Sequence, residues 1–165
     1  MNAQGHIKIA AMLILQTDKE ILLMIRNKEP NKGKYLPVGG KLLEFENPEA
    51  AAIRECHEET GFIPKELKLA GILCETSPVQ YNWLSYIYTS RVEKFIPPKC
   101  EEGELVWVDI NSLSHIQIPQ VNNYVYEHFL KQKLFILSAS YNEQLELILL
   151  KDEILNQLVY ESQRL

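Results

Sequence analysis

The segment from Asn47 to Thr60 constrains the fold more than any other part of this sequence. Asn47 can accept a hydrogen bond as a helix N-cap, and Pro48 suits the first helical position. Glu49 places a negative charge at the positive end of the helix dipole, and Gly61 suits the residue that follows the last turn. These signals predict one helix over this segment, with both of its ends defined by local chemistry.

Three glutamates of this helix share one side. Glu55, Glu58 and Glu59 stand at i, i+3 and i+4, so they cover an arc of about 100°. Like charges at this spacing repel by roughly a few tenths of a kcal/mol, and a hard divalent cation would offset that repulsion, because Mg²⁺ prefers carboxylate oxygens. The alternative is a solvated acidic face, partly neutralised by Arg54, which stands four residues before Glu58.

The rest of the chain is predicted to alternate between strands and helices. The predicted strands are residues 7–15, 20–26, 67–74, 83–88 and 104–109, with short apolar runs at 134–138 and 145–150. Residues 27–35 are polar and contain proline and glycine, which predicts an exposed loop. Further helices are predicted over residues 121–130 and 152–160. This pattern predicts a single α/β or α+β domain over residues 1–165 with a mixed sheet.

The composition fits a globular domain and argues against several kinds of partner. The chain has 22 acidic and 17 basic residues, and its net charge of −5 argues against coating nucleic acids or binding anionic membranes. Three cysteines without C-x-x-C spacing indicate neither a disulfide framework nor a zinc site. The sequence opens with no signal-peptide pattern, so a cytoplasmic location is expected. The oligomeric state stays open between a monomer and a homodimer.

The acidic helix belongs to a longer pattern. Gly40 is followed after five residues by Glu46, and after seven more by the run RECHEETGF at residues 54–62. This spacing resembles the signature of the Nudix (MutT-like) hydrolases, G-x5-E-x7-R-E-U-x-E-E-x-G-U, in which U is aliphatic. Every fixed position is matched, and Cys56 and Phe62 stand at two U positions. The resemblance implies the Nudix fold, a mixed sheet sandwiched between helices.

The resemblance also implies a metal-dependent hydrolase and a set of site residues. Nudix hydrolases cleave a nucleoside diphosphate linked to another group, usually with Mg²⁺, for which Mn²⁺ can substitute. Glu55 or Glu58 would position or deprotonate the attacking water, and the choice between them stays open. Glu46 would pair with Arg54 and hold the loop and helix in place. The implied metal ligands are the Gly39 carbonyl, Glu55, Glu58, Glu59 and a later carboxylate, either Glu102 as first choice or Glu101.

Substrate-binding residues are less constrained. Arg26 and Lys41 lie where the family places cations that hold phosphates, and the alternative for each is a plain surface charge. Asn122 and Asn123 could bind a base edge or could simply begin the second helix as caps. One aromatic among Tyr81, Trp83, Tyr86 and Tyr88 could stack on a base.

The first functional hypothesis is hydrolysis of an ordinary or oxidised nucleoside triphosphate to the monophosphate and pyrophosphate. Residues 34–41, 101–107 and 121–135 look like the family members with that activity. The pattern departs at Phe45, where the family carries glycine, and at an asparagine that is missing before the glycines. Phe45 could change the loop, stand exposed beside the substrate or pack within the loop. The alternatives are ADP-ribose, a nucleotide sugar, a dinucleotide polyphosphate or capped RNA as substrate, and a non-catalytic nucleotide-sensing module.

Overall fold

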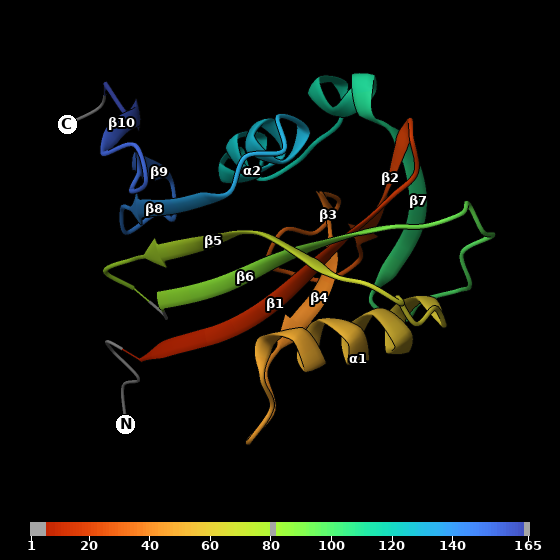
Figure 1. Cartoon of the computed structure of the whole chain (residues 1–165). Coiled ribbons are helices and arrows are strands. Elements are labelled where there is room, and N and C mark those ends of the chain that lie inside the picture. The colour runs from red at the N-terminus through yellow and green to blue at the C-terminus, as the bar shows by residue number, and fades with distance from the viewer. Residues whose placement is uncertain (1–5, 80–81, 164–165) are drawn as a thin grey trace.

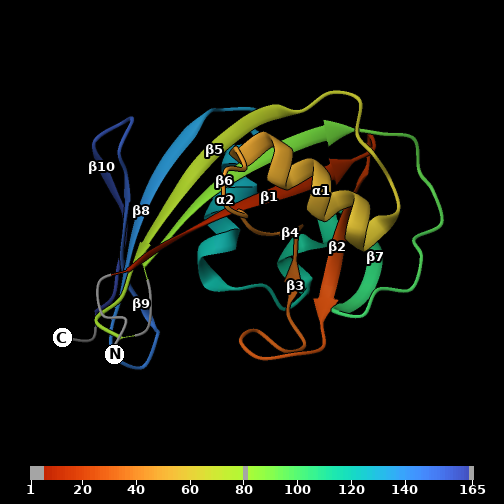
Figure 2. The same ribbon diagram turned by 90° about the horizontal axis from the view of Figure 1, so that it is seen from below.

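One mixed sheet organises the molecule, which is described by a computed structural model for residues 6–79 and 82–163 (Figure 1). Ten strands of these residues pair into the sheet, and the two longer helices lie on its opposite faces (Figures 1 and 2). The predicted mixed sheet between helices is therefore confirmed. Tyr81, one of the aromatic candidates, lies outside the described residues.

The elements follow the chain in a simple order. The strands are β1 (Ile7–Gln16), β2 (Glu20–Arg26), β3 (Tyr35–Leu36), β4 (Val38–Lys41), β5 (Lys68–Thr76), β6 (Asn82–Arg91), β7 (Gly103–Asp109), β8 (Phe135–Tyr141), β9 (Leu147–Asp152) and β10 (Gln157–Glu161). The helices are α1 (Pro48–Thr60), the 3-10 helix η1 (Ile110–His115) and α2 (Gln120–Leu130). Across the sheet the order is β10-β9-β8-β5-β6-β1-β2-β3, with β4 paired to β1 and β7 paired to β2. The β1–β6 and β5–β8 pairs are parallel.

Helix α1 begins and ends where local chemistry predicts. The Asn47 side chain accepts a hydrogen bond from the Ala50 N–H at 2.8 Å, and Pro48 occupies the first turn. Gly61 adopts φ 69°, and its N–H donates to the His57 carbonyl at 2.9 Å. The left-handed backbone at this position favours glycine because it has no Cβ. The predicted helix boundaries are confirmed.

The two faces of the sheet bury separate hydrophobic clusters. In β1, Ile14 packs under α2 with Ile87 and Phe135, whereas Leu13 and Leu15 pack on the α1 side. Neighbouring residues of a strand point to opposite faces, so one strand feeds both clusters. The sheet is thus covered on each side, and α1 is held against it by buried side chains that include those of Ala51, Ala52 and Cys56.

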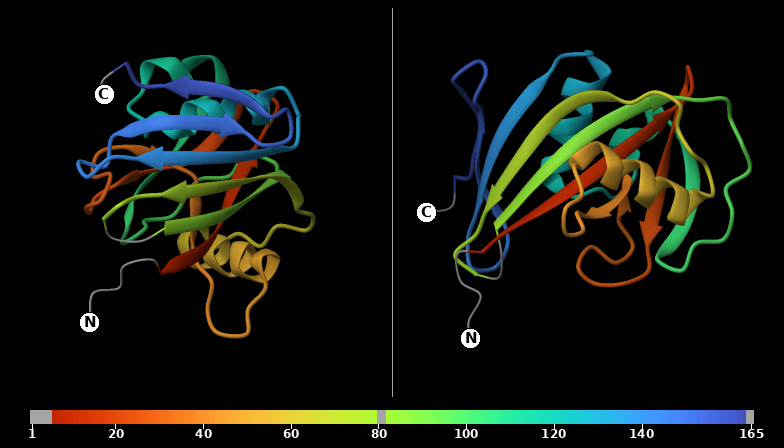
Figure 3. Two further views of the ribbon diagram at one scale, coloured as in Figure 1. Left: turned by 90° about the vertical axis from the view of Figure 1, so that its left-hand side faces the viewer. Right: turned by 60° about the horizontal axis from the view of Figure 1, so that its bottom comes forward.

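The C-terminal part of the chain differs from the sequence prediction. Residues 152–160 do not form a helix: β9 and β10 pair as an antiparallel hairpin, side by side with β8 at one end of the sheet (Figure 3). Asp152 accepts hydrogen bonds from the N–H groups of Ile154 and Leu155 at 2.9 and 3.0 Å, and Asn156 has φ 51°. Aspartate and asparagine favour such turns, and this chemistry overrides the helical spacing of the leucines.

Two further elements were not anticipated. Residues 27–34 form the predicted loop, but Tyr35–Leu36 and Val38–Lys41 are short strands that pair with β2 and β1. Through this pairing Gly39 lies opposite Met12, and Gly40 lies opposite Ala11. Among the helices that the structure describes, none is long and apolar enough to cross a membrane.

Candidate active site

Paired glycines bring the backbone of β4 against the acidic side of α1. A Cβ on Gly40 would lie 2.5 Å from Glu55 Oε1, and a Cβ on Gly39 would collide with the backbone of β1. Gly39 also has φ 144°, a conformation that other residues rarely adopt. The backbone of β1 and the positive φ therefore require glycine at position 39, whereas glycine at position 40 leaves room for the Glu55 carboxylate.

Glu59 is the buried carboxylate of this site. It is 8% exposed, and its Oε2 accepts a hydrogen bond from the Gly39 N–H at 3.0 Å. Burial raises the pKa of Glu59 to about 8, since the Gly39 hydrogen bond and the charge of Arg26 only partly oppose burial and the charges of Glu55 and Glu102. At neutral pH Glu59 therefore mostly keeps its proton, and it ionises readily only when a ligand supplies positive charge beside it.

Arg54 joins the loop to the helix and neutralises its outer glutamates. Its guanidinium binds both oxygens of Glu46, at 2.9 and 3.0 Å, and its Nη1 lies 2.7 Å from Glu55 and 3.1 Å from Glu58. Its Nη2 also donates to the Lys41 carbonyl at 3.0 Å. The hydrogen bonds from Arg54 lower the pKa of Glu46, so this pair stays ionised at neutral pH.

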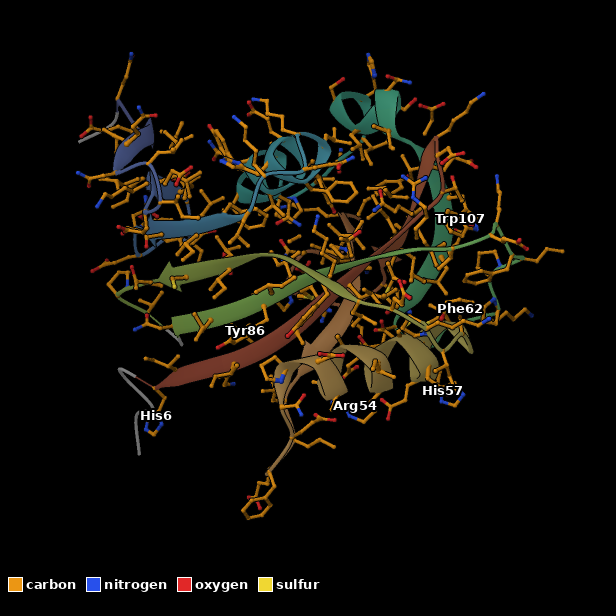
Figure 4. All side chains as sticks on the ribbon, in the orientation of Figure 1. His6, Arg54, His57, Phe62, Tyr86 and Trp107 are labelled. Carbon is orange, nitrogen blue, oxygen red and sulfur yellow. The ribbon has the colours of Figure 1, made fainter. Side chains whose placement is uncertain are left out.

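The Glu46–Arg54 pair expected from the pattern is thus present, and its role in catalysis remains a prediction. Figure 4 shows Arg54 and His57 along α1, and His57 is exposed to solvent. The three helix glutamates do not share one environment: Glu59 is buried, whereas the Glu58 side chain is 57% exposed.

Arg26 and Glu102 lie together at the ends of β2 and β7. Arg26 Nη1 is 3.9 Å from Glu102 Oε2, and the charges of both residues act on the pKa of Glu59. Asn27 secures the loop by donating from its backbone to the Glu102 carbonyl and from its side chain to the Glu101 carbonyl. The charge of Glu102 acts to raise the pKa of Glu59, which favours Glu102 as the later carboxylate of the site.

The donor chemistry of the site fits a hard divalent cation. Glu55, Glu59 and Glu102 offer only oxygen, and Glu59 is buried with one hydrogen bond, so added positive charge would be stabilised there. Within residues 6–79 and 82–163, no three carboxylate, imidazole or thiol side chains already stand close enough to hold an ion. Ion binding would therefore require small side-chain movements, and the full ligand set, with the Gly39 carbonyl and Glu58, remains a prediction.

The asparagines proposed for base recognition lie on the opposite side of the sheet. Asn122 and Asn123 lie in the first turn of α2, so they begin this helix as predicted, but Pro119 occupies the N-cap position and neither asparagine caps the helix. Asn123 donates from its side chain to the Gln120 carbonyl at 3.2 Å. In the described part of the chain, no hydrogen bond or ion pair links either asparagine to the glutamates of α1.

Lys41 and Phe45 occupy different surroundings from each other. Lys41 points its ammonium toward the Trp83 ring, 5.8 Å from the ring centroid, while its carbonyl binds Arg54. Phe45 keeps the left-handed turn, with φ 63°, and its side chain is fully exposed. The interpretation of Phe45 as packed within the loop is therefore wrong. The contact with Trp83 could not be read from the sequence, although the tryptophan was one of several aromatic candidates.

Comparison with known proteins gives one family. A model of the NUDIX domain matches residues 5–129. The ADP-ribose pyrophosphatase of Methanocaldococcus jannaschii is 40% identical over 67 residues, which cover 41% of this chain and 40% of that protein. The chain therefore matches well under half the length of that relative.

Solved structures share the fold at low identity. The mutator MutT protein from Bacillus halodurans superposes with a TM-score of 0.79 at 20% identity, covering 89% of this chain and 98% of that chain. The NUDIX domain of Shewanella oneidensis NrtR, solved in complex with ADP ribose, gives 0.64 at 17% identity, covering 80% and 90%. With the family model matching most of the chain and the glycines and glutamates of the pattern gathered at one site, the chain belongs to the Nudix family of hydrolases.

Proposed function

We propose that this protein is a metal-dependent pyrophosphohydrolase that cleaves a nucleoside diphosphate linked to another group. The observation that carries the proposal is the burial of Glu59 beside Gly39, within reach of the charges of Glu55 and Glu102. A carboxylate site short of positive charge suits cations, and the bare backbone of two glycines lets phosphate groups approach closely.

We assign the glutamates two roles, binding of the metal ion and activation of the attacking water. Glu55, Glu59, Glu102 and the Gly39 carbonyl would hold Mg²⁺, or Mn²⁺ in its place. Such an ion, when bound, screens the phosphates, polarises the attacked phosphoryl group and lowers the pKa of bound water. Glu58 is the more exposed helix glutamate and would position or deprotonate water, with Glu55 as the alternative.

Arginine side chains complete the arrangement. Arg54 contacts both Glu55 and Glu58 and so orients the candidate bases, while its two bonds to Glu46 keep the guanidinium in place. Arg26 stands beside Glu102 at the edge of the site and would offset charge on a non-attacked phosphate. Arg54 is thus a positioning residue, and Arg26 is a candidate phosphate ligand.

The leading substrate class is the nucleoside triphosphates, which would yield a monophosphate and pyrophosphate. The sequence pattern and the fold shared with the MutT protein support this class. Hydrolysis of ADP-ribose is the second candidate, and the 40% identity to an ADP-ribose pyrophosphatase over 67 residues favours it. The glutamates of the pattern are all present, which argues against a module that only senses nucleotides.

A substrate panel with Mg²⁺ or Mn²⁺ tests the proposal. Triphosphates, ADP-ribose, nucleotide sugars, dinucleotide polyphosphates and capped RNA are incubated with the protein, and the products are separated by chromatography. Glu58→Gln is expected to lower kcat about 100-fold or more, the scale of a lost general base. Glu127→Gln is the matched control, because this exposed glutamate pairs with Lys131 on α2. Equal activity of the two variants would contradict the assigned site, and binding without turnover would favour a sensing role.

A further inference from the structure

A tryptophan and two lysines meet on the face of the sheet that α2 covers. Trp83 lies four residues before Ile87 on β6, so both point to that face, where Ile87 joins the core under α2. The ammonium groups of Lys8 and Lys41 each lie 5.8 Å from the centroid of the Trp83 ring. The indole is half-buried, so it combines a fixed position with a reachable surface.

A carboxylate from the neighbouring strand stands beside this indole. Glu75 of β5 pairs directly with Trp83 of β6, a register that places the two Cβ atoms about 5 Å apart. Tyr141 of β8 donates its hydroxyl to Glu75 Oε1 at 2.7 Å. This hydrogen bond goes to one oxygen of Glu75, and the Glu75 side chain is half-buried, so the carboxyl group is partly reachable from solvent. The pair of Glu75 and Tyr141 thus presents an oriented acceptor next to an aromatic surface.

Lys41 connects this group to the candidate active site. Along β1, Gly39 pairs with Met12, Lys41 pairs with Ala10, and Lys8 pairs with Trp83. Four residues of β1 therefore separate the level of Gly39 from that of Trp83, a distance of about 13 Å along the strand. Lys41 stands midway. An extended ligand with phosphates at Gly39 and an aromatic group at Trp83 would pass this lysine.

We propose that Trp83 and the Glu75–Tyr141 pair form the base subsite of this enzyme, and that the subsite takes a purine nucleotide whose base presents N–H donors. The inference rests on the proposed function, because it names the substrate class of the same site. A purine covers more of an indole than a pyrimidine does, and stacking of a base on an aromatic side chain raises affinity by about 5- to 100-fold. The hydrogen bond that Glu75 receives from Tyr141 leaves its other oxygen as an acceptor toward the indole, and an acceptor at this place selects a base edge that donates.

The lysines play a separate part. Both ammonium groups end flexible stems, so Lys41 can move from the ring toward phosphate oxygens when a base occupies the indole face. Tyr141 belongs to β8, which lies beyond residues 5–129 matched by the family model. The subsite therefore depends on a strand that the shared domain pattern does not include, and the parallel pairing of β5 with β8 brings it into place.

Nucleoside monophosphates are the probes for a binding test that does not require turnover. The chain has two tryptophans, so a Trp107→Phe background leaves Trp83 as the only fluorescent indole. We expect GMP and AMP to quench this fluorescence with Kd values about 10-fold lower than those of CMP and UMP, as stacking contributions of this size predict. Unquenched fluorescence, or equal Kd values for purines and pyrimidines, would overturn the proposal.

Calorimetric binding measurements on variants test which residues produce the preference for purines. Trp83→Leu is expected to weaken GMP and AMP binding about 10-fold, Glu75→Gln about 10-fold, and Tyr141→Phe about threefold. Tyr160→Phe on β10 is the matched control, because Tyr160 contacts Tyr124 and lies on another strand. Melting temperatures confirm folding, and Glu75→Gln carries the test if Trp83→Leu is unstable. Purine affinity that survives in both variants would refute the subsite.

The two proposals fail in different ways. Purine binding at Trp83 without hydrolysis of any nucleotide would overturn the proposed function and leave the subsite standing. Hydrolysis that depends on Glu58, with no effect of Trp83 or Glu75 on purine preference, would uphold the function and overturn the subsite.

Discussion

Glu59 and Asp152 are both buried carboxylates, at 8% and 3% exposure, yet they lie in opposite electrostatic surroundings. Glu59 at the candidate site accepts one hydrogen bond, and its burial raises its pKa to about 8. Burial also acts to raise the pKa of Asp152, but hydrogen bonds from Leu155, His128 and Ile154 together bring it below the ordinary value. Hydrogen bonds from the hairpin and from α2 stabilise the charge of Asp152, whereas Glu59 lacks such partners and ionises readily only beside added positive charge.

The largest effect on stability is expected from removing Asp152, the carboxylate whose charge is stabilised by hydrogen bonds. Asp152→Ala removes the acceptor for two backbone N–H groups and for His128, whose Nε2 lies 3.2 Å away. We expect the free energy of unfolding to fall by about 3 kcal/mol, the scale of a broken buried pair. Denaturant unfolding measures this change, and kcat per folded molecule should stay constant, because Asp152 is remote from the glutamates of α1.

The pH dependence gives the sign of this contribution. The pKa of Asp152 is lowered on folding, so its stabilisation is present above the ordinary aspartate pKa of 3.8 and is lost as the pH falls through the lower folded value. The difference between wild type and Asp152→Asn should therefore shrink below pH 4. An unchanged difference at low pH would show that the charge of Asp152 is not what stabilises the hairpin.

Gly40→Ala should break the site without breaking the fold. The added Cβ would displace the Glu55 carboxylate, which is the far end of a flexible side chain. We expect kcat/KM to fall about 100-fold, or about 2.7 kcal/mol, while the unfolding free energy changes by about 0.5 kcal/mol or less. Gly71→Ala is the matched control: its Cβ would meet the buried ring of Phe135, so it should cost about 1–3 kcal/mol of stability and leave kcat unchanged. The reverse pattern would contradict the placement of Glu55.

Glu59→Gln tests the other carboxyl of this comparison, because it removes the group that ionises near pH 8. Because folding raises the pKa of Glu59, its stabilising contribution is complete below the ordinary glutamate pKa of 4.5 and is lost as the pH rises through about 8. Without metal, the variant should be more stable than wild type at pH 8 by about 1–3 kcal/mol, with no such gain at pH 4. Added Mg²⁺ should raise the melting temperature of wild type more than that of the variant. Equal metal effects on the two proteins would remove Glu59 from the ligand set.

Phe45→Gly has the smallest expected effect. Its left-handed backbone at φ 63° costs a non-glycine residue about 1–2 kcal/mol, and its side chain is fully exposed. Glycine relieves that cost but loses more chain entropy, so we expect a net stabilisation of about 0.5 kcal/mol in thermal unfolding. A destabilised variant would show that Phe45 makes contacts that offset its backbone conformation.

Contacts between residues that are close in the sequence could be predicted, whereas contacts between residues far apart in the sequence could not. The caps of α1 and the Glu46–Arg54 pair join residues no more than eight positions apart, so spacing and residue type were sufficient to predict them. Tyr141 and Glu75 are 66 positions apart, and their contact requires the parallel pairing of β5 with β8. The helix expected over residues 152–160 failed for a related reason, since strand pairing with β9 outweighed a local helical spacing.

The sequence alone predicts the mixed α and β domain, both ends of α1 and the family pattern of glycines and glutamates. These features depend on short spacings and on the intrinsic preferences of residues. The burial of Glu59, the influence of Glu102 on its pKa and the meeting of Trp83 with Lys41 and Glu75 follow only from the folded chain. Strands from distant parts of the chain determine burial and cross-strand contacts. Burial shifts the pKa values of side chains, and cross-strand contacts create the binding surface.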